Sequence, residues 1–296
     1  MTARGPAPGA LPPREMALAI LVAAVWGVGF VAIKAGVAQA PPLFLTAVRF
    51  ALAAFPGVLF IPRPKARWRD LVGYGLCIGV GQFGLLFLAI RDGMPAGLAS
   101  LVIQTQAIFT IALAHVLMKQ ATRPRQLFGA FVALSGVAVI GLARGAEAPT
   151  APFLSVLAAA VFWSAGNIFS IRAGRANMMG FIVWSSAFAP LPLLALSLAL
   201  EDRAAIAAAI LRPTFVVWGG AAFLAYGGTL IGYGLWGHLL ARRPAAQVAP
   251  FALLVPVFGM ASTAAVFGEP LGAGVLAGAA LVLSGLAITT IAPRRS

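Results

Sequence analysis

The chain has 296 residues, of which 61% are hydrophobic and only 9% are charged. A soluble domain carries roughly 25% charged residues, so this chain lacks the polar groups to cover itself in water, and a lipid bilayer is the solvent that fits. The formal net charge of +14 comes from short basic clusters between long apolar runs, which excludes nucleic acid as a partner and is typical of a membrane protein. One cysteine, Cys77, excludes a disulfide framework.

Ten apolar runs follow one another along the chain, and each can cross the hydrocarbon core as a helix of about 20 residues. The runs are residues 16–34, 42–61, 71–90, 96–118, 126–143, 151–171, 179–199, 214–238, 245–268 and 272–291. Their short connections carry the Pro, Gly, Arg and Asp residues that end helices. The runs are too long for barrel strands and do not alternate as such strands do. The sequence therefore predicts an all-α membrane protein with ten transmembrane helices.

The fifth and tenth runs repeat one another when residues 126–140 are aligned with residues 275–289, a shift of 149 positions. The identical pairs are Leu127/Leu276, Gly129/Gly278, Ala130/Ala279, Leu134/Leu283, Ser135/Ser284, Gly136/Gly285 and Ala138/Ala287. The shift is about half the chain, which predicts two copies of one unit, residues 1–145 and 146–296. Because each copy holds five spans, an odd number, the second copy is expected to be inverted in the membrane.

The basic residues also predict which way the chain faces. With the N-terminus in the cytoplasm, most of the 21 Lys and Arg residues fall on the cytoplasmic side, as the positive-inside rule requires. Ten spans then return the C-terminus to the same side. Two inverted repeats that rock around a midplane site are typical of transporters that work by alternating access.

Three short motifs mark a resemblance to a known family. They are W-x-x-x-F at Trp26–Phe30, R-F at Arg49–Phe50 in the second span, and G-E at Gly268–Glu269 before the last span. With ten spans in two copies, the chain resembles the EamA family of the drug/metabolite transporter superfamily. That resemblance implies a bacterial inner-membrane exporter of amino acids, with aromatic ones as the nearest expectation, or of related small amphiphilic metabolites. We expect a monomer, and we expect Glu269 to cap a helix.

Polar and aromatic side chains near the middle of the spans are the candidates for substrate contact. They are Trp26, Gln82, Gln104, Gln106, Trp163, Asn167, Tyr226 and Tyr233. Amides can donate to a carboxylate and accept from an ammonium group, and aromatic faces can hold an apolar side chain or a cation. The alternative is that the amides only bond neighbouring helices together. At helical spacing, Tyr226, Thr229 and Tyr233 would form one stripe.

Arg49 is the one charge well inside a predicted span. It either attracts a substrate carboxylate or reaches outward to water or helix-end carbonyls. No Asp or Glu lies within a predicted span, and coupled carriers commonly use buried carboxylates, so we expect facilitated diffusion or exchange. No metal or cofactor motif is present, which disfavours the alternative of a membrane-embedded enzyme. A passive channel is a second alternative, which would favour a ring of like residues.

Overall fold

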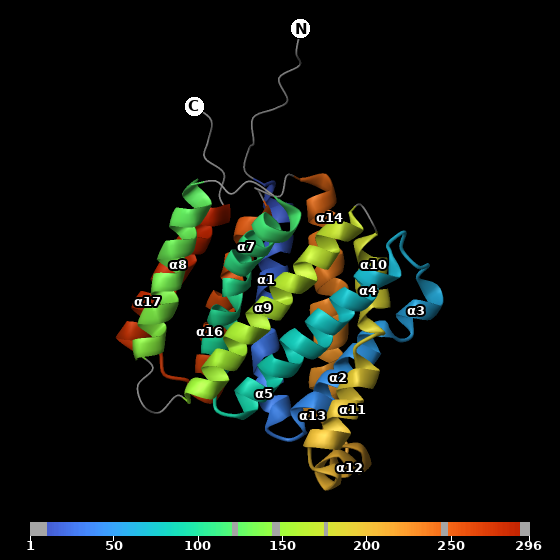
Figure 1. Ribbon diagram of the computed structural model, residues 1–296. Helices are drawn as coiled ribbons and strands as arrows, with labels where there is room; N and C mark the ends of the chain where they lie inside the picture. Colours follow the sequence, from blue (N-terminus) through green and yellow to red (C-terminus); the bar gives the residue numbers. More distant parts are fainter. Residues whose placement is uncertain (1–10, 120–123, 144–148, 175–176, 244–247, 291–296) are drawn as a thin grey trace.

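The computed structural model describes residues 11–119, 124–143, 149–174, 177–243 and 248–290. Within these residues the protein is all-helical, with seven helices long and apolar enough to cross a membrane and three shorter apolar helices. These helices correspond one by one to the ten predicted runs. They form a single bundle in which α1 begins and α17 ends at the same end (Figure 1).

The first half of the chain supplies five of these apolar helices. Several are built from more than one segment, and prolines open α1 and α2, where a missing N–H and a fixed φ suit the first turn. The segments are α1 (Pro13–Val37), α2 (Pro42–Ala54), α3 (Gly57–Phe60), α4 (Trp68–Gly75), η1 (Leu76–Gly84), α5 (Leu85–Arg91), α6 (Ala96–Val102), η2 (Ile103–Thr105), α7 (Gln106–Met118) and α8 (Pro124–Ala143).

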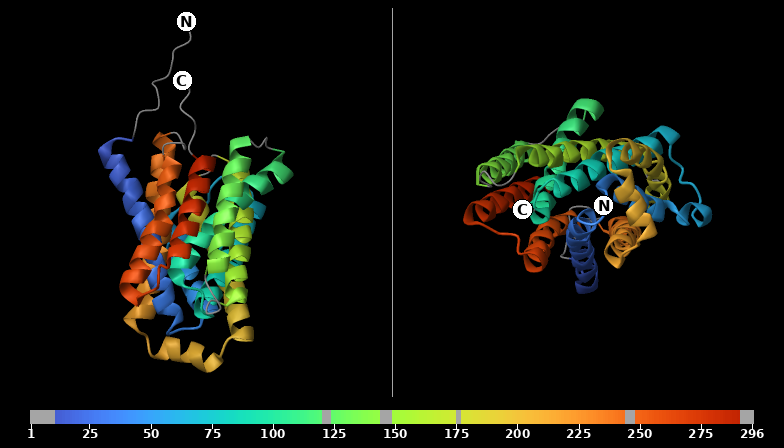
Figure 2. Two further views of the ribbon diagram at one scale, coloured as in Figure 1. Left: turned by 90° about the vertical axis from the view of Figure 1, so that its left-hand side faces the viewer. Right: turned by 90° about the horizontal axis from the view of Figure 1, so that it is seen from below.

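The second half supplies the other five and one short helix that the sequence did not predict. The segments are α9 (Thr150–Ala173), α10 (Met178–Ser186), α11 (Pro190–Leu200), α12 (Arg203–Leu211), α13 (Phe215–Ala222), η3 (Phe223–Ile231), α14 (Gly232–Arg242), η4 (Ala249–Leu253), α16 (Leu254–Phe267) and α17 (Ala273–Thr290). Helix α12 is the unpredicted one, because its apolar run is too short for a span. The Asp202 carboxylate caps it by accepting from the Ala204 amide, and it lies across the end of the bundle (Figure 2).

Irregular helix occurs at corresponding places in the two halves of the described chain. The third apolar helix of each half contains a π-helical stretch, η1 in the first half and η3 in the second. The fourth contains a 3₁₀ stretch, η2 and η4 respectively. π-helical turns bond i to i+5 and are frequent at functional sites. The matched distortions therefore indicate where each half is adapted for more than spanning the membrane.

The repeated helices α8 and α17 pack against each other side by side (Figure 1). A Cβ atom added to Gly136 would lie 2.7 Å from the Gly278 carbonyl oxygen, and one added to Gly285 would lie 2.5 Å from the Gly129 carbonyl oxygen. Only glycine allows backbones to approach so closely. Because the early part of α8 faces the late part of α17, the two helices run antiparallel.

Two acidic residues lie inside helices that begin earlier than predicted. Glu15 is in the first turn of α1, and Asp70 is in the first turn of α4, where it is buried. Each lies one residue before a predicted run, 16–34 or 71–90, so the helices begin earlier than the runs do. The cause is that a hydropathy run begins at the first apolar residue, whereas a helix begins at its cap.

Candidate substrate cavity

A cavity of about 360 Å³ lies between the two halves of the chain. This volume falls within the range of small-molecule sites. Both halves contribute to its walls, the first through α1, α2, α4, η1, α5, η2 and α7 and the second through α9, α10, η3, α14, η4 and α16. Of the nine predicted residues, the cavity is lined by Trp26, Arg49, Gln82, Gln104, Gln106, Trp163, Asn167 and Tyr233.

Tyr226 lies outside the cavity and is 37% exposed. The expected stripe of Tyr226, Thr229 and Tyr233 assumed 3.6 residues per turn. In the π-helical stretch η3 each turn holds more residues. Residues four apart then stay on one face, and Thr229 and Tyr233 both line the cavity. Residues three apart then point in different directions, so Tyr226 faces away from the cavity that Thr229 lines.

An aromatic cluster forms one wall of the cavity. The ring of Trp26 lies 5.1 Å from the ring of Tyr233 and 5.4 Å from that of Trp236, measured between centroids. The Trp26 indole N–H donates to the Gly228 carbonyl oxygen at 2.8 Å. A Cβ atom at position 232 would lie 2.5 Å from Trp26 Nε1, so Gly232 leaves room for this ring. The wall is therefore held in place by a hydrogen bond between the two halves.

The predicted amides divide into a bonded pair and a pair with free groups. Asn167 Nδ2 donates to Gln106 Oε1 at 2.8 Å and to Thr110 Oγ1 at 3.0 Å, which links α9 to α7. These two amides thus act as interhelical bonds. Gln82 and Gln104 are buried against the cavity, and their amides have no hydrogen-bond partner among the described residues. Buried amides are normally satisfied, so these two remain available to a ligand.

Arg49 is buried at the cavity, with 4% of its surface exposed. Its Nη2 donates to the Thr229 hydroxyl at 3.0 Å. Its guanidinium carbon lies 4.0 Å from the centroid of the Phe83 ring and 4.7 Å from that of Phe50. The alternative that Arg49 reaches outward or bonds helix-end carbonyls is wrong. The rings and the Thr229 hydroxyl hold the guanidinium in the interior, where cation–π contacts offset part of its lost hydration.

Sequence reasoning missed Tyr74, Phe83 and Trp236, which also line the cavity. A signal was available for one of them, because Trp236 follows Tyr233 by three residues and shares its helix face in α14. Phe83 follows Gln82 inside η1, where ordinary helical spacing fails.

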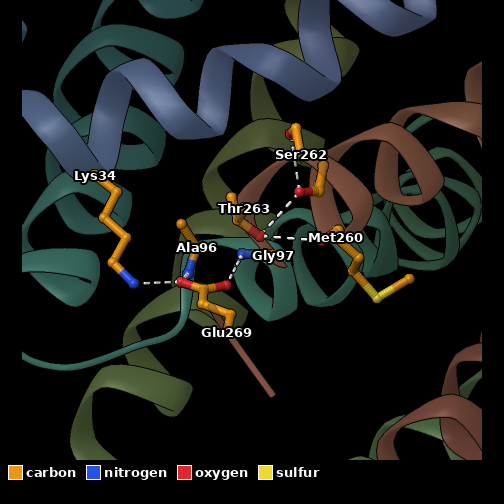
Figure 3. A network of polar contacts seen from close by, with 8 residues as sticks. Lys34, Ala96, Gly97, Met260, Ser262, Thr263 and Glu269 are labelled. Atoms are coloured by element: carbon orange, nitrogen blue, oxygen red, sulfur yellow. Dashed lines mark hydrogen bonds and ion pairs between the residues drawn. The ribbon is translucent and has the colours of Figure 1, made fainter. Parts of the chain in front are cut away.

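Two carboxylates accept hydrogen bonds from helix N-termini at the end of the bundle opposite to the beginning of α1. Glu269 accepts from the backbone amides of Ala96 and Gly97 at 2.9 Å each and from Lys34 Nζ at 2.6 Å (Figure 3). The expected capping role of Glu269 is confirmed, and the capped helix is α6. At the same end, Glu201 accepts from the backbone amides that begin α2. Anionic groups at helix N-termini also interact favourably with the helix dipole.

The pKa of Glu269 reflects these contacts. Its side chain is only 7% exposed, and burial alone raises the pKa of a carboxyl group. Hydrogen bonds from Lys34 and from the backbone amides of Gly97 and Ala96 outweigh that effect and hold the pKa below its ordinary value. Glu269 is therefore ionised at neutral pH, and its negative charge strengthens the contact between α1, α6 and the loop after α16.

The cavity itself extends toward the other end of the bundle. Its lining includes Met178, the first residue of α10, and Ser170 in the last turn of α9. The end of α9 and the beginning of α10 lie at the end of the bundle where α1 begins (Figure 1). The structure thus has its carboxylate contacts at one end and the cavity reaching toward the opposite one.

A two-copy helical membrane protein with a cavity between its halves has the architecture of a transporter. The chain belongs to the EamA-like transporter family, whose sequence profile matches residues 14–142 and again residues 151–291. The family resemblance is thereby confirmed, and the chain is a transporter of this family and not an enzyme.

Three curated relatives match nearly the full chain. A probable amino-acid metabolite efflux pump of Salmonella typhimurium is 44% identical, with 92% of this chain and 93% of the relative covered. A protein of the same description from Escherichia coli K12 is 40% identical, with 95% and 96% covered. A probable terminal-alkyne amino-acid exporter of Streptantibioticus cattleyicolor is 30% identical, with 90% of both covered.

A solved crystal structure shares the fold. It superimposes with a TM-score of 0.65 at 20% identity and covers 94% of this chain and 97% of its own. This likeness supports the helical arrangement alone.

Proposed function

We propose that the protein exports amino acids, aromatic ones among them, or related small amphiphilic metabolites across the bacterial inner membrane. Both termini face the cytoplasm in this proposal, because most basic residues lie on that side. The names of the two relatives at 44% and 40% identity support the substrate class. An inner membrane transporter of Escherichia coli at 24% identity supports the location. We expect the monomer to be the working unit, because one chain supplies both halves of the cavity.

The transport mechanism we propose is alternating access by two inverted repeats, residues 1–145 and 146–296. Five apolar helices in each half, the double match to the family profile, the antiparallel packing of α8 on α17 and the paired irregular stretches all support it. The observation that carries the proposal is that one cavity takes its walls from both halves. Rocking one half against the other then changes which end of the cavity is open.

In this proposal the substrate is bound by two kinds of side chain in the cavity wall, amides and aromatic rings. The free amides of Gln82 and Gln104 bond the polar end of the substrate, and the rings of Trp26, Trp163 and Tyr233 hold its apolar end. Gln106 and Asn167 keep α7 and α9 in register beside it. Among the described residues, no Asp or Glu lines the cavity. Transport therefore proceeds by facilitated diffusion or exchange, without ion coupling through a cavity carboxylate.

The test is a panel of radiolabelled amino acids in proteoliposomes. The proposal predicts saturable counterflow of at least one of them, strongly reduced in Trp163→Ala and Gln104→Ala. Phe131→Ala is the control, because Phe131 is exposed on the outer face of α8. Transport that does not saturate would favour a channel. If neither cavity substitution changes the transport of any substrate, the cavity assignment fails.

A further inference from the structure

Arg49 brings a positive charge into the cavity without a matching negative one. Among the residues that the structure describes, Arg49 is the charged side chain in the lining, and no carboxylate accompanies it. An isolated charge taken out of water is costly unless it is paired. The rings of Phe50 and Phe83 offset only part of that cost. The site is therefore electrostatically incomplete when it is empty.

The hydrogen bonds of Arg49 are incomplete in the same way. Its Nη2 donates to Thr229, but its Nε is buried and has no partner within the described part of the chain. The Thr229 hydroxyl donates to the Leu224 carbonyl oxygen at 3.0 Å, which leaves its lone pairs to accept from Arg49. Thr229 thus fixes the guanidinium while leaving the Nε–H free. Arginine donors in a fixed planar fork match the geometry of a carboxylate.

We propose that Arg49 is the carboxylate-binding group of this transporter and that it selects substrates by charge. The site takes small molecules that carry a carboxylate and have a net charge of zero or minus one. It rejects the corresponding amines and amino acids with a cationic side chain, because no acidic group in the lining can pair with a second positive charge. This inference rests on the proposed function and narrows its substrate class. Thr229 is a positioning residue that acts through Arg49.

Binding is measured separately from transport, using the tryptophans that line the cavity as reporters. Trp26, Trp163 and Trp236 line the cavity, so we expect their fluorescence to change when a ligand enters. The probes, in detergent solution, are two matched sets and lysine. The sets are leucine with 4-methylpentanoate and 3-methylbutylamine, and phenylalanine with 3-phenylpropanoate and 2-phenylethylamine. We expect the amino acids and the acids to bind, and we expect the amines and lysine to bind at least tenfold more weakly.

The variants test the role of Arg49. Losing a charge-assisted hydrogen bond typically costs tenfold to about a hundredfold in affinity, so Arg49→Gln should weaken carboxylate binding by about that factor and reduce the preference over amines. Arg49→Lys keeps the charge, so its affinity for carboxylates should lie between those of the wild type and Arg49→Gln. Thr229→Val should lower the affinity less than Arg49→Gln does. Arg91→Gln is the matched control, because Arg91 is exposed at the end of α5 and pairs with Asp92.

Each outcome decides one of the two proposals. Amines that bind as tightly as the acids, carboxylate affinity unchanged in Arg49→Gln, or no response to any carboxylate would overturn the assignment of Arg49. Arg49→Lys and Thr229→Val replace a side chain with one of similar size. If Arg49→Gln fails to fold, these two variants still test the role of Arg49. Carboxylate binding through Arg49 without counterflow of any amino acid would refute export and leave the binding site standing. Amino-acid counterflow that is unchanged in Arg49→Gln would support export and refute the role of Arg49.

Discussion

Glu269 gives the sharpest prediction about stability. The substitution Glu269→Gln keeps the shape of the side chain and removes its charge. It weakens the caps on Ala96 and Gly97 and abolishes the ion pair with Lys34. A lost helix cap costs about 0.5–2 kcal/mol, and hydrogen bonds to a charged group contribute about 1.5–3 kcal/mol. Because glutamine retains part of the capping, we expect a loss of about 2 kcal/mol at pH 7.

The pH dependence of this loss identifies its cause. The pKa of Glu269 is lowered in the folded protein from an ordinary value of 4.5. A depressed pKa contributes stability above the unfolded value, and that contribution disappears as the pH falls through the folded pKa. The difference between wild type and variant is therefore full at pH 7 and shrinks below about pH 4.5, where the wild-type carboxylate takes up its proton.

The assay is thermal unfolding in detergent between pH 7 and pH 3.5. Asp92→Asn is the matched control, because Asp92 belongs to an ion pair with both side chains more than 40% exposed. Such pairs contribute about 0–1 kcal/mol. If Glu269→Gln is as stable as Asp92→Asn at pH 7, or if its deficit is the same at every pH, the account of this contact is refuted.

Four further substitutions test other parts of the structure. Gly136→Leu should push α8 from α17, because its Cβ would lie 2.7 Å from backbone atoms of the facing helix; the expected loss of several kcal/mol, in the range of overpacking or more, is measured by thermal unfolding. Trp26→Phe removes the bond to the Gly228 carbonyl and should cost about 1 kcal/mol in the same assay; an unchanged midpoint would contradict that bond. Tyr226→Ala should leave counterflow unchanged, whereas Tyr233→Ala should raise KM; equal effects would place both tyrosines at the substrate.

The ten helices could be predicted from hydropathy because lipid requires long apolar segments. The first run, residues 16–34, became α1 at Pro13–Val37. The extra residues at its start include the charged Arg14 and Glu15, which a hydropathy run leaves out. The short helix α12 was missed because its nine residues are too few for a span, which was the only kind of helix that the hydropathy runs were read for.

The cavity could be predicted only in part. Glutamine, asparagine and tryptophan residues near the middle of a span are expected to face protein rather than lipid, because polar groups in lipid are costly, and the six predicted residues of these types all line the cavity. The π-helical stretch η3 could not be foreseen from spacing, and it turned Tyr226 away. The partners of Glu269 were equally hidden, because Ala96 lies 173 positions earlier in the chain.

The central claim is that one cavity faces the two sides of the membrane in turn. Gln104→Cys on a Cys77→Ser background puts a single thiol in the cavity wall. A membrane-impermeant maleimide is applied to right-side-out and to inside-out vesicles, with and without a transported amino acid. The account predicts labelling from both sides and slower labelling when substrate is present. Labelling from one side only, under every substrate condition, would contradict alternating access around this cavity.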